Sequence, residues 1–387
     1  MVELNRINKI QHNKYSISIA FTIMYDIAIV GAGFSGLTLA ERFSSVGRKV
    51  VVVESRNHIG GNAHDSFDDH GILIHNYGAH IFHTNDDAVF SYLSKFTAWR
   101  EYIHKTSAFV DGKLLPFPIN RKTLEILYGE EALKDGVQKF LEKIKVNIPQ
   151  PRNAEENIVS RMGWDLYDKF FRGYTEKQWG RKPSELSPMV TNRIPIHYDY
   201  DERYFNDKHQ VMPEKGYDPL FWNMVSKGGF PVILNADWHE VHNEIKYKHL
   251  IYTGPIDRFF NFKFGRLPYR SIDFKLTFHE KEFYQPVASI KFSNDFDYTR
   301  RIEFKYITSQ KHPYTVTSEE FPKSEGDPYY PIPAEDAQIL YQKYQNEAKK
   351  LKDVKFVGRL ATYRYYNMDQ VVAEALNEFK KLLSLGW

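Results

Sequence analysis

A glycine-rich turn between a strand and a helix is the feature that most restricts how this chain can fold. The β-branched run at residues 25–30 ends in Gly31-Ala32-Gly33-Phe34-Ser35-Gly36, and a helical pattern follows. A second apolar run, residues 49–53, closes at Glu54 and completes a βαβ unit. Glycines at this spacing let the backbone approach a pyrophosphate, so the sequence predicts a dinucleotide-binding α/β domain.

The residues around the turn indicate how such a ligand would be held. The helix N-terminus offers free N–H groups and partial positive charge to a pyrophosphate. Glu54 is placed to accept hydrogen bonds from an adenosine ribose, and an acid there favours a free 2′-hydroxyl. The alternative, glycines that only form turns, does not account for the strand, helix and acid together. The next run, Arg56-Asn57-His58-Ile59-Gly60-Gly61, resembles the flavoprotein version of this fold and favours FAD.

Composition excludes several classes of function. With 52 basic against 49 acidic residues, the formal charge of +3 is too balanced for a protein whose main partner is nucleic acid. The absence of cysteine excludes disulfides, a thiolate nucleophile and cysteine-bound metal, which fits a cytoplasmic location. Residues 15–24 resemble the apolar part of a signal peptide, but no small-residue cleavage site follows, and Asp26 and the glycines interrupt the apolar run. We therefore expect neither secretion nor a membrane span.

The rest of the chain divides by its periodicity. A long stretch beginning near residue 122 is helical in period and rich in charge, which predicts a separate helical lobe. Four segments alternate apolar and polar residues and predict an antiparallel sheet, namely 107–117, 274–278, 287–292 and 301–308. Helical patterns begin again at Pro333 and at Met368.

Five sequence blocks carry a more specific resemblance. They are 77–84 (YGAHIFHT), 173–180 (GYTEKQWG), 252–257 (YTGPID) with 267–271 (LPYRS), 327–331 (DPYYP) and 358–365 (GRLATYRY). In this order they resemble the UDP-galactopyranose mutase family, from Met24 nearly to the C-terminus.

The resemblance implies a Rossmann-like FAD-binding domain interrupted by a helical bundle and a twisted antiparallel β-sheet. The domain ranges that we expect are 1–23 for an N-terminal extension; 24–95, 211–257 and 332–387 for the FAD-binding domain; 96–120, 196–210 and 258–331 for the sheet domain; and 121–195 for the helical domain, with a mobile lid near 183–199.

The resemblance also implies a reaction. It is the redox-neutral interconversion of UDP-galactopyranose and UDP-galactofuranose, an isomerisation through a covalent intermediate between the sugar and N5 of reduced FAD. The chain has no cysteine and no recognisable Ser-His-Asp or paired-carboxylate motif. The absence of such a nucleophile among its own residues is consistent with a nucleophile that a cofactor supplies.

Four residues are expected to be catalytic. A departing UDP carries a diphosphate whose growing charge suits forked guanidinium groups. The resemblance assigns this task to Arg193, in the lid, and Arg300, on a strand. It places His83 and Arg359 near the flavin. An isolated arginine is more often a solvated surface charge, so the motif context carries this assignment. No third ligand matches His80 and His83, so we expect no metal.

Aromatic side chains are expected to hold the nucleotide. Phe170, Phe171, Tyr174 and Trp179 recur at helical spacing, a pattern that is more often core. The resemblance assigns the last three to the nucleotide, and the diphosphate and sugar to Tyr204, Tyr329, Tyr330 and Tyr365. Asn367 stands where relatives often have Asp, which leaves the sugar preference open, and Asp369 is a candidate cap of the last helix.

The residues expected to hold the flavin come from the same motifs. They are Gly31, Gly33, Phe34, Ser35, Gly36, Glu54, Ser55, Arg56, Gly61, Asn62, His80, Ile81, His83, Gly254, Arg359 and Met368.

Three alternatives stay open. The same mechanism could act on another nucleotide sugar, such as UDP-N-acetylgalactosamine or a deoxy sugar. The scaffold could serve a flavin amine-oxidase-like oxidoreductase, or a non-catalytic protein that binds nucleotide sugars. The expected partners are a UDP-sugar and an external electron donor that reduces FAD, with a homodimer left open.

Overall fold

The computed structural model describes residues 23–387, and within them a five-stranded parallel sheet contains the glycine-rich turn. Its strands, in sheet order, are β10 (Val232–Ile233), β2 (Val50–Val53), β1 (Met24–Val30), β11 (Lys246–Tyr252) and β17 (Val354–Phe356). All four valines of β2 are buried. Val50 and Val52 pack into one hydrophobic cluster, whereas Val51 and Val53 pack into another. This burial on both faces is typical of a parallel sheet covered on each side.

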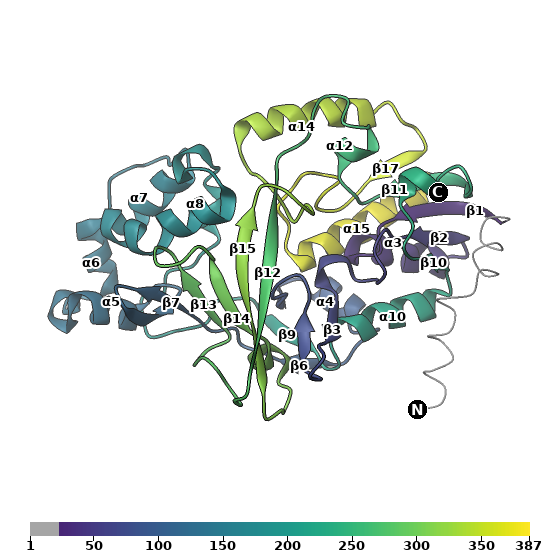
Figure 1. Ribbon diagram of the computed structural model, residues 1–387. Helices are drawn as coiled ribbons and strands as arrows, with labels where there is room; N and C mark the ends of the chain where they lie inside the picture. Colours follow the sequence, from purple (N-terminus) through teal and green to yellow (C-terminus); the bar gives the residue numbers. More distant parts are fainter. Residues whose placement is uncertain (1–22) are drawn as a thin grey trace.

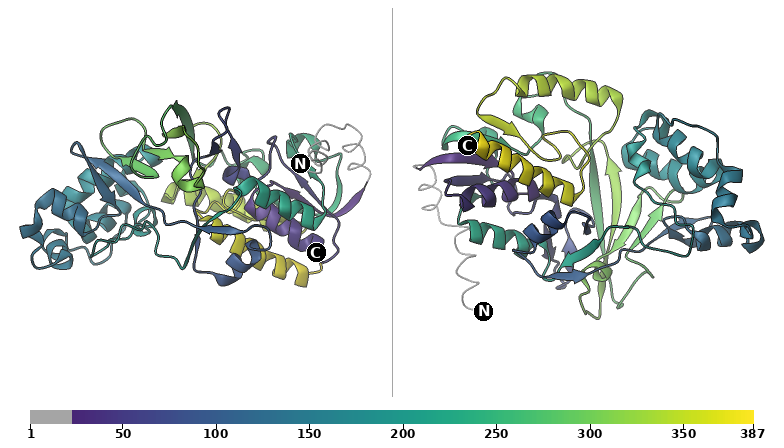
Figure 2. Two further views of the ribbon diagram at one scale, coloured as in Figure 1. Left: turned by 90° about the horizontal axis from the view of Figure 1, so that it is seen from below. Right: turned by 180° about the vertical axis from the view of Figure 1, so that it is seen from behind.

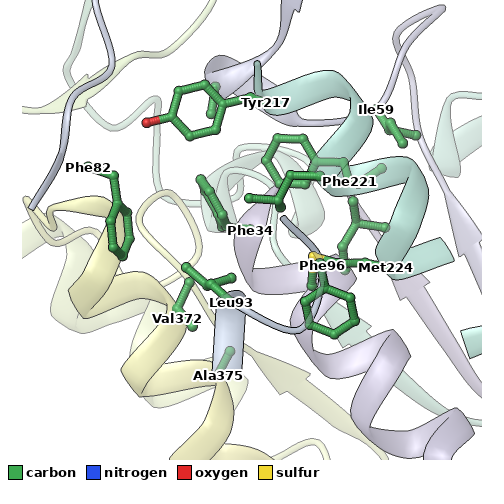
Figure 3. Close-up of a cluster of buried hydrophobic side chains, with 14 of the residues drawn as sticks. Phe34, Ile59, Phe82, Leu93, Phe96, Tyr217, Phe221, Met224, Val372 and Ala375 are labelled. Carbon is green, nitrogen blue, oxygen red and sulfur yellow. The ribbon is translucent and has the colours of Figure 1, made fainter. Parts of the chain in front are cut away.

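Three helices cover one face of this sheet. They are α3 (Phe34–Ser45), α10 (Tyr217–Gly228) and α15 (Met368–Ser384). Figure 3 shows how Phe34, Phe221 and Val372, one from each helix, enter the same buried cluster. The other face packs against Trp238 of α11 (Trp238–Val241) and Phe259 of α12 (Ile256–Phe259). The Rossmann-like α/β prediction is confirmed.

A second, seven-stranded sheet lies beside the first. Its strands, in sheet order, are β16 (Tyr330–Pro331), β12 (Tyr269–His279), β15 (Thr315–Lys323), β14 (Arg300–Glu303), β13 (Ser289–Phe292), β7 (Thr106–Val110) and β8 (Lys113–Phe117). Neighbouring strands run antiparallel, except that β13 and β7 are parallel.

The parallel pair differs from the antiparallel prediction, and the segment predicted as one strand over 107–117 is the hairpin of β7 and β8. Two further details also differ. The segment predicted as one strand over 301–308 leaves the sheet at Glu303, and α13 (Phe304–Thr308) continues as a helix. Its apolar residues Phe304 and Ile307 are three apart and both are buried, which is a helical spacing. Strand β15 was not predicted, although it pairs with β12 over nine residues.

Helices from the middle of the chain share another hydrophobic core with strands β7 and β8. The helices are α5 (Arg121–Tyr128), α6 (Val137–Ile144) and α7 (Ala154–Tyr167), followed by a π-helical segment at Asp168–Arg172 and by α8 (Gly173–Trp179), whose Trp179 packs into a different cluster. Leu124, Leu141 and Leu166 pack in the shared core beside Phe170 and Phe171. The short α9 (Met189–Asn192) follows.

Figure 1 shows these helices at one side, the parallel sheet at the other, and the long strands β12 and β15 between them. The view from behind in Figure 2 gives the same order. The remaining elements are β3 (Asp65–Phe67), β4 (Leu73–His75), β5 (Phe82–Thr84), β6 (Trp99–Glu101), β9 (His209–Pro213), α4 (Asp87–Leu93), α14 (Glu335–Ala348) and the 3₁₀ turns η2 (Gly61–Ala63), η3 (Glu130–Leu133) and η5 (Pro183–Glu185). The predicted domain ranges and the lid remain predictions, and the extension at 1–23 lies outside the described residues except for Ile23.

Candidate functional site

The turn between β1 and α3 forms a tight backbone cradle. Gly31 has φ +101°, and a Cβ added there would lie 2.1 Å from the Thr253 hydroxyl oxygen. A Cβ added at Gly36 would lie 1.9 Å from the carbonyl oxygen of Gly31. No side chain caps the N-terminus of α3. Its first N–H groups are therefore available to an anion, as a pyrophosphate site requires.

Glu54 fixes the end of β2 against this turn. Its carboxylate is buried and accepts hydrogen bonds from the N–H of Ala32 at 2.8 Å and the N–H of Arg56 at 2.9 Å. The carboxylate thus lies at the mouth of the turn, where the ribose contact was predicted. Arg56 donates to Asn62 Oδ1 at 2.9 Å, and its guanidinium lies 4.3 Å from the ring centre of Tyr77.

A cavity of about 500 Å³ opens over the cradle, within the size range of ligand pockets. It brings together most of the predicted flavin residues, namely Gly31, Gly33, Phe34, Ser35, Glu54, Ser55, Arg56, Gly61, Asn62, His80, Gly254, Arg359 and Met368. Burial, together with the positive charges of Arg359 and Arg300, lowers the pKa of His80 to about 4, so its imidazole is neutral at pH 7.

Three predicted flavin residues do not line this cavity. Gly36 packs against the carbonyl group of Gly31 in the turn, and Ile81 is buried. His83 Nδ1 lies 2.8 Å from Asp207 Oδ2, and its ring stacks on Phe205. The cavity also contains Asp237, Trp238 and Arg258, which sequence reasoning missed. Arg258 directly follows the recognised block at 252–257, and this position was the available signal.

A second cavity gathers the predicted substrate residues from four parts of the chain. They are Phe170, Phe171, Tyr174, Trp179, Arg193, Tyr204, Arg300, Tyr330 and Tyr365. Tyr329 lines the first cavity instead. Asn367 lines neither cavity. It is the N-cap of α15, and its N–H donates to Gln370 Oε1 at 3.0 Å. The suggested cap, Asp369, instead accepts a hydrogen bond from Thr84 Oγ1 at 3.0 Å.

Both predicted arginines line this second cavity, but different groups hold their side chains. Arg300 lies opposite the fully buried Glu320 on β15, and its Nε donates to Glu320 Oε2. Arg193 ends α9, keeps solvent exposure and lies with its guanidinium 4.5 Å from the ring centre of Tyr365. One cation is thus fixed by a carboxylate, whereas the other rests on an aromatic face.

Arg359 joins the two cavities. It lines the first, and its guanidinium lies 5.5 Å from the ring centre of Tyr330 and 5.6 Å from that of Tyr365, both of which line the second. The rings of Tyr330 and Tyr365 are 5.6 Å apart. Arg359 therefore forms one side of a wall between the cavities, and Tyr330 and Tyr365 form the other side.

Lys291 is the charged residue of the second cavity that sequence reasoning missed. It is 8% exposed, and its Nζ donates to the Tyr204 hydroxyl oxygen at 3.0 Å. Burial raises the pKa of Tyr204, but the charges of Lys291, Arg193 and Arg300 outweigh it and bring that pKa down to about 8. A lysine between the apolar residues Ile290 and Phe292, within a predicted strand, was the available signal.

Within residues 23–387, no group of three or more His, Cys, Asp or Glu side chains is placed to hold a metal ion. No helix in the same range is long and apolar enough to cross a bilayer.

Fold and site together define a Rossmann-like dinucleotide-binding protein with an adjoining cavity of cations and aromatic rings. A family model for an NAD(P)-binding Rossmann-like domain matches residues 29–96, and one for UDP-galactopyranose mutase matches residues 169–365. The chain belongs to the UDP-galactopyranose mutase family. Membership of a mutase family places it among isomerases.

Two relatives and two solved structures illustrate the range of similarity. A probable UDP-galactopyranose mutase of Klebsiella pneumoniae is 36% identical, covering 93% of this chain and 95% of the relative. A dTDP-fucopyranose mutase of Escherichia coli is 35% identical, with 91% and 97% covered. A reduced UDP-galactopyranose mutase superposes with a TM-score of 0.76 at 18% identity, covering 94% of each chain. A putative protoporphyrinogen oxidase from Exiguobacterium gives 0.67 at 12%, covering 93% and 99%. At these identities the two structures show the fold alone.

Proposed function

We propose that this chain is a UDP-galactopyranose mutase that interconverts UDP-galactopyranose and UDP-galactofuranose with noncovalently bound, reduced FAD. One observation carries the proposal. Arg193 and Arg300 converge in an aromatic cavity that shares the wall of Arg359, Tyr330 and Tyr365 with the dinucleotide cavity. A cofactor and a nucleotide sugar would therefore meet at this wall.

The first cavity fits a dinucleotide. Gly31 and Gly36 allow a turn too tight for any Cβ atom, and the N–H groups at the start of α3 lack side-chain caps. Glu54 lies at the mouth of the turn, where its carboxylate would be next to a bound ribose. The residues that would hold FAD are the cradle, Glu54, Arg56, Asn62 and Arg359. Bound FAD in its reduced form would supply the N5 nucleophile that the chain lacks.

The second cavity would hold the UDP-sugar. Tyr174 and Trp179 offer ring faces to a uracil, while Phe170 and Phe171 form the floor against the helical core. The two guanidinium groups suit the diphosphate, whose charge grows as the bond to the sugar breaks. Because Arg300 is held by Glu320, it is pre-oriented for that charge. The aromatic wall would limit the access of water to the reacting centre.

The identity of the sugar nucleotide has a second candidate. The dTDP-fucopyranose mutase is nearly as similar to this chain as the probable UDP-galactopyranose mutase is. A deoxy sugar carried by dTDP is therefore the main alternative substrate. An N-acetylated UDP-sugar is a weaker alternative. An amine-oxidase-like reaction is supported by fold likeness only.

The deciding experiment tests reaction type and donor together. FAD-loaded protein is reduced with dithionite in the absence of oxygen. One portion is incubated with UDP-galactofuranose and another with dTDP-fucofuranose, and the products are separated by chromatography. We expect UDP-galactopyranose to form with no electron acceptor consumed, and oxidised protein to be inactive. Faster turnover of the dTDP-sugar would favour the second candidate. Consumption of oxygen with each turnover, in a parallel reaction of the oxidised protein in air, would favour an oxidase.

A further inference from the structure

Two positive side chains stand directly opposite each other on neighbouring strands of the second cavity. Lys291 on β13 is the register partner of Arg300 on β14, and both line the cavity. Residues opposite each other in an antiparallel pair extend from the same face, with Cβ atoms about 5 Å apart, and like charges there are destabilising. Such a pair calls for a compensating negative charge.

The described part of the chain supplies only one negative charge to this pair of cations. Glu320 pairs with Arg300, and it is the register partner of Arg300 on the other side, across β14 and β15. Among residues 23–387, neither Lys291 nor Arg193 forms an ion pair, and Lys291 donates to the neutral hydroxyl of Tyr204. Burial and the two arginine charges lower the pKa of Lys291, as expected for a cation without a carboxylate. Two positive charges in the cavity are thus left for a ligand to neutralise.

Aromatic rings hold the ammonium group in place without neutralising it. Lys291 Nζ lies 4.1 Å from the ring centre of Phe117, 4.6 Å from that of Tyr204 and 5.5 Å from that of Tyr174. Contacts between a cation and aromatic faces offset part of the cost of removing the charge from water. The lysine can therefore remain buried while its charge stays available.

Lys291 also sets the direction of the Tyr204 hydroxyl. An ammonium group has three donors and no acceptor, so the Tyr204 oxygen must accept from it. The proton of Tyr204 is then left to donate to something else, and Tyr204 itself lines the cavity. An anion that enters would receive one donor from Tyr204 in addition to the charge of Lys291.

We propose that Lys291 is a third cation of the diphosphate site, that it positions Tyr204 as a donor to the diphosphate, and that it makes the cavity selective for nucleoside diphosphates over monophosphates. The inference rests on the proposed function, because it assumes that a nucleotide sugar occupies this cavity. A diphosphate within a sugar nucleotide carries its two negative charges on two phosphate groups, so it can contact both cations that lack a carboxylate. A monophosphate has only one phosphate group with which to reach them.

The test measures the affinity of the FAD-loaded enzyme for UDP, UMP and uridine by calorimetry. Lys291→Met keeps the length of the side chain and removes the charge. We expect it to weaken UDP binding at least tenfold and UMP binding less, and to leave uridine binding within twofold. Lys291→Arg should restore most of the preference for UDP over UMP. Lys169→Met, which removes a lysine paired with Asp111 at the surface, is the control and should bind all three ligands like the wild type.

A double-mutant cycle isolates the link to Tyr204. If Lys291 orients the hydroxyl, the losses of UDP affinity in Lys291→Met and Tyr204→Phe will not add, because each change already removes the shared interaction. If the methionine variant does not fold, Lys291→Gln takes its place in the cycle, because glutamine keeps a hydrogen-bond donor without the charge. Additive losses would contradict the positioning role.

Two results would overturn the inference. Unchanged UDP affinity in Lys291→Met would show that the lysine does not contact the ligand. Equal losses for uridine and UDP would show that it contacts the base. A wild-type enzyme that does not bind UDP would instead contradict the proposed function itself, so the two failures are distinguishable.

Discussion

Arg300 and Arg301 are adjacent in the sequence, but their side chains extend from opposite faces of β14. Arg300 pairs with the buried Glu320 and lines the second cavity. Arg301 extends to the other face of β14, where it pairs with Glu319 at 2.9 Å and contacts Tyr298. Side chains alternate along a strand, so one residue step separates a cavity residue from a structural one. The pair provides a matched control for the site.

We expect Arg193→Ala to lower kcat/KM by roughly 10²- to 10³-fold, about 3–4 kcal/mol, as the loss of a group that stabilises a developing anion does. FAD content should not change. Arg300→Lys should lower kcat/KM in the same direction, because it keeps a charge near the buried Glu320 but loses the forked geometry.

Arg301→Ala is the control for both variants and should retain nearly full activity. Steady-state kinetics of the reduced enzyme, with flavin absorbance as the measure of cofactor content, checks all three. If Arg193→Ala turned over like the wild type with bound flavin, that arginine would have no part in the reaction.

Titration of Tyr204 predicts how UDP binding depends on pH. Its pKa of about 8 means that the hydroxyl is neutral and a donor below pH 8, and a phenolate above it. A phenolate cannot donate and repels a diphosphate. UDP affinity should therefore fall as pH rises through about 8, and Tyr204→Phe should abolish this step. Calorimetric titrations from pH 6.5 to 9.5 test it, and an identical pH profile in the phenylalanine variant would contradict the assignment.

At the scale of elements, local patterns predicted what local sequence controls. Three local patterns predict β1, α3 and β2 independently of the rest of the chain. They are the turn at Gly31–Gly36, the helical period after it and the run of valines in β2. Strand β15 and the parallel pairing of β13 with β7 depend on partners far along the chain, so periodicity could not supply them. The cavity residues that were predicted came mainly from the glycine-rich turn and the family resemblance. Lys291 lay outside every motif, and only the register of β13 with β14 brings it to Arg300.

Two glycines of the cradle are expected to respond differently to alanine. At Gly36 the added Cβ would lie 1.9 Å from a backbone oxygen, so Gly36→Ala should distort the junction of β1 and α3 and destabilise the protein. At Gly33 the nearest atom to an added Cβ, Gly61 Cα, is at an ordinary 3.8 Å, but Gly33 lines the cavity.

Gly33→Ala should therefore fold with nearly wild-type stability and bind FAD more weakly. Thermal unfolding of the apoprotein and FAD titration separate the two effects. Wild-type FAD affinity in Gly33→Ala would place the pyrophosphate away from this turn.

At the scale of the whole molecule, buried histidines should make the fold sensitive to acid. Burial lowers the pKa of His75 and of His104 to about 3, and His75 Nδ1 accepts a hydrogen bond from the N–H of His80. Both rings stay neutral in the folded protein, whereas the unfolded chain binds protons below about pH 6.5. Their contribution to stability is present above pH 6.5 and is lost as pH falls toward 3.

Asp65 acts in the opposite direction. Burial raises its pKa to about 6, so the stability it contributes increases as pH falls through 6. His64 and His80, whose pKa values burial lowers to about 4, add to the loss, and Asp218, whose pKa burial raises to about 6, opposes it. Four histidines against two aspartates leave a net loss, and we expect the free energy of unfolding to fall from pH 6.5 to pH 4.5. Urea unfolding at several pH values measures it, and NMR of the imidazole nitrogens should find His75 neutral at pH 5. A charged His75 at that pH would contradict the assignment.

The wall that Arg359, Tyr330 and Tyr365 form between the two cavities has a thermodynamic consequence. Two ligands that contact one wall are linked, and by whatever factor the nucleotide changes the affinity for the cofactor, the cofactor changes the affinity for the nucleotide by the same factor. For a two-electron cofactor this reciprocity extends to its oxidation states. A substrate that prefers the reduced form raises the reduction potential by about 30 mV for each tenfold preference. The concentration of the sugar nucleotide would then help to set the fraction of enzyme in its working state.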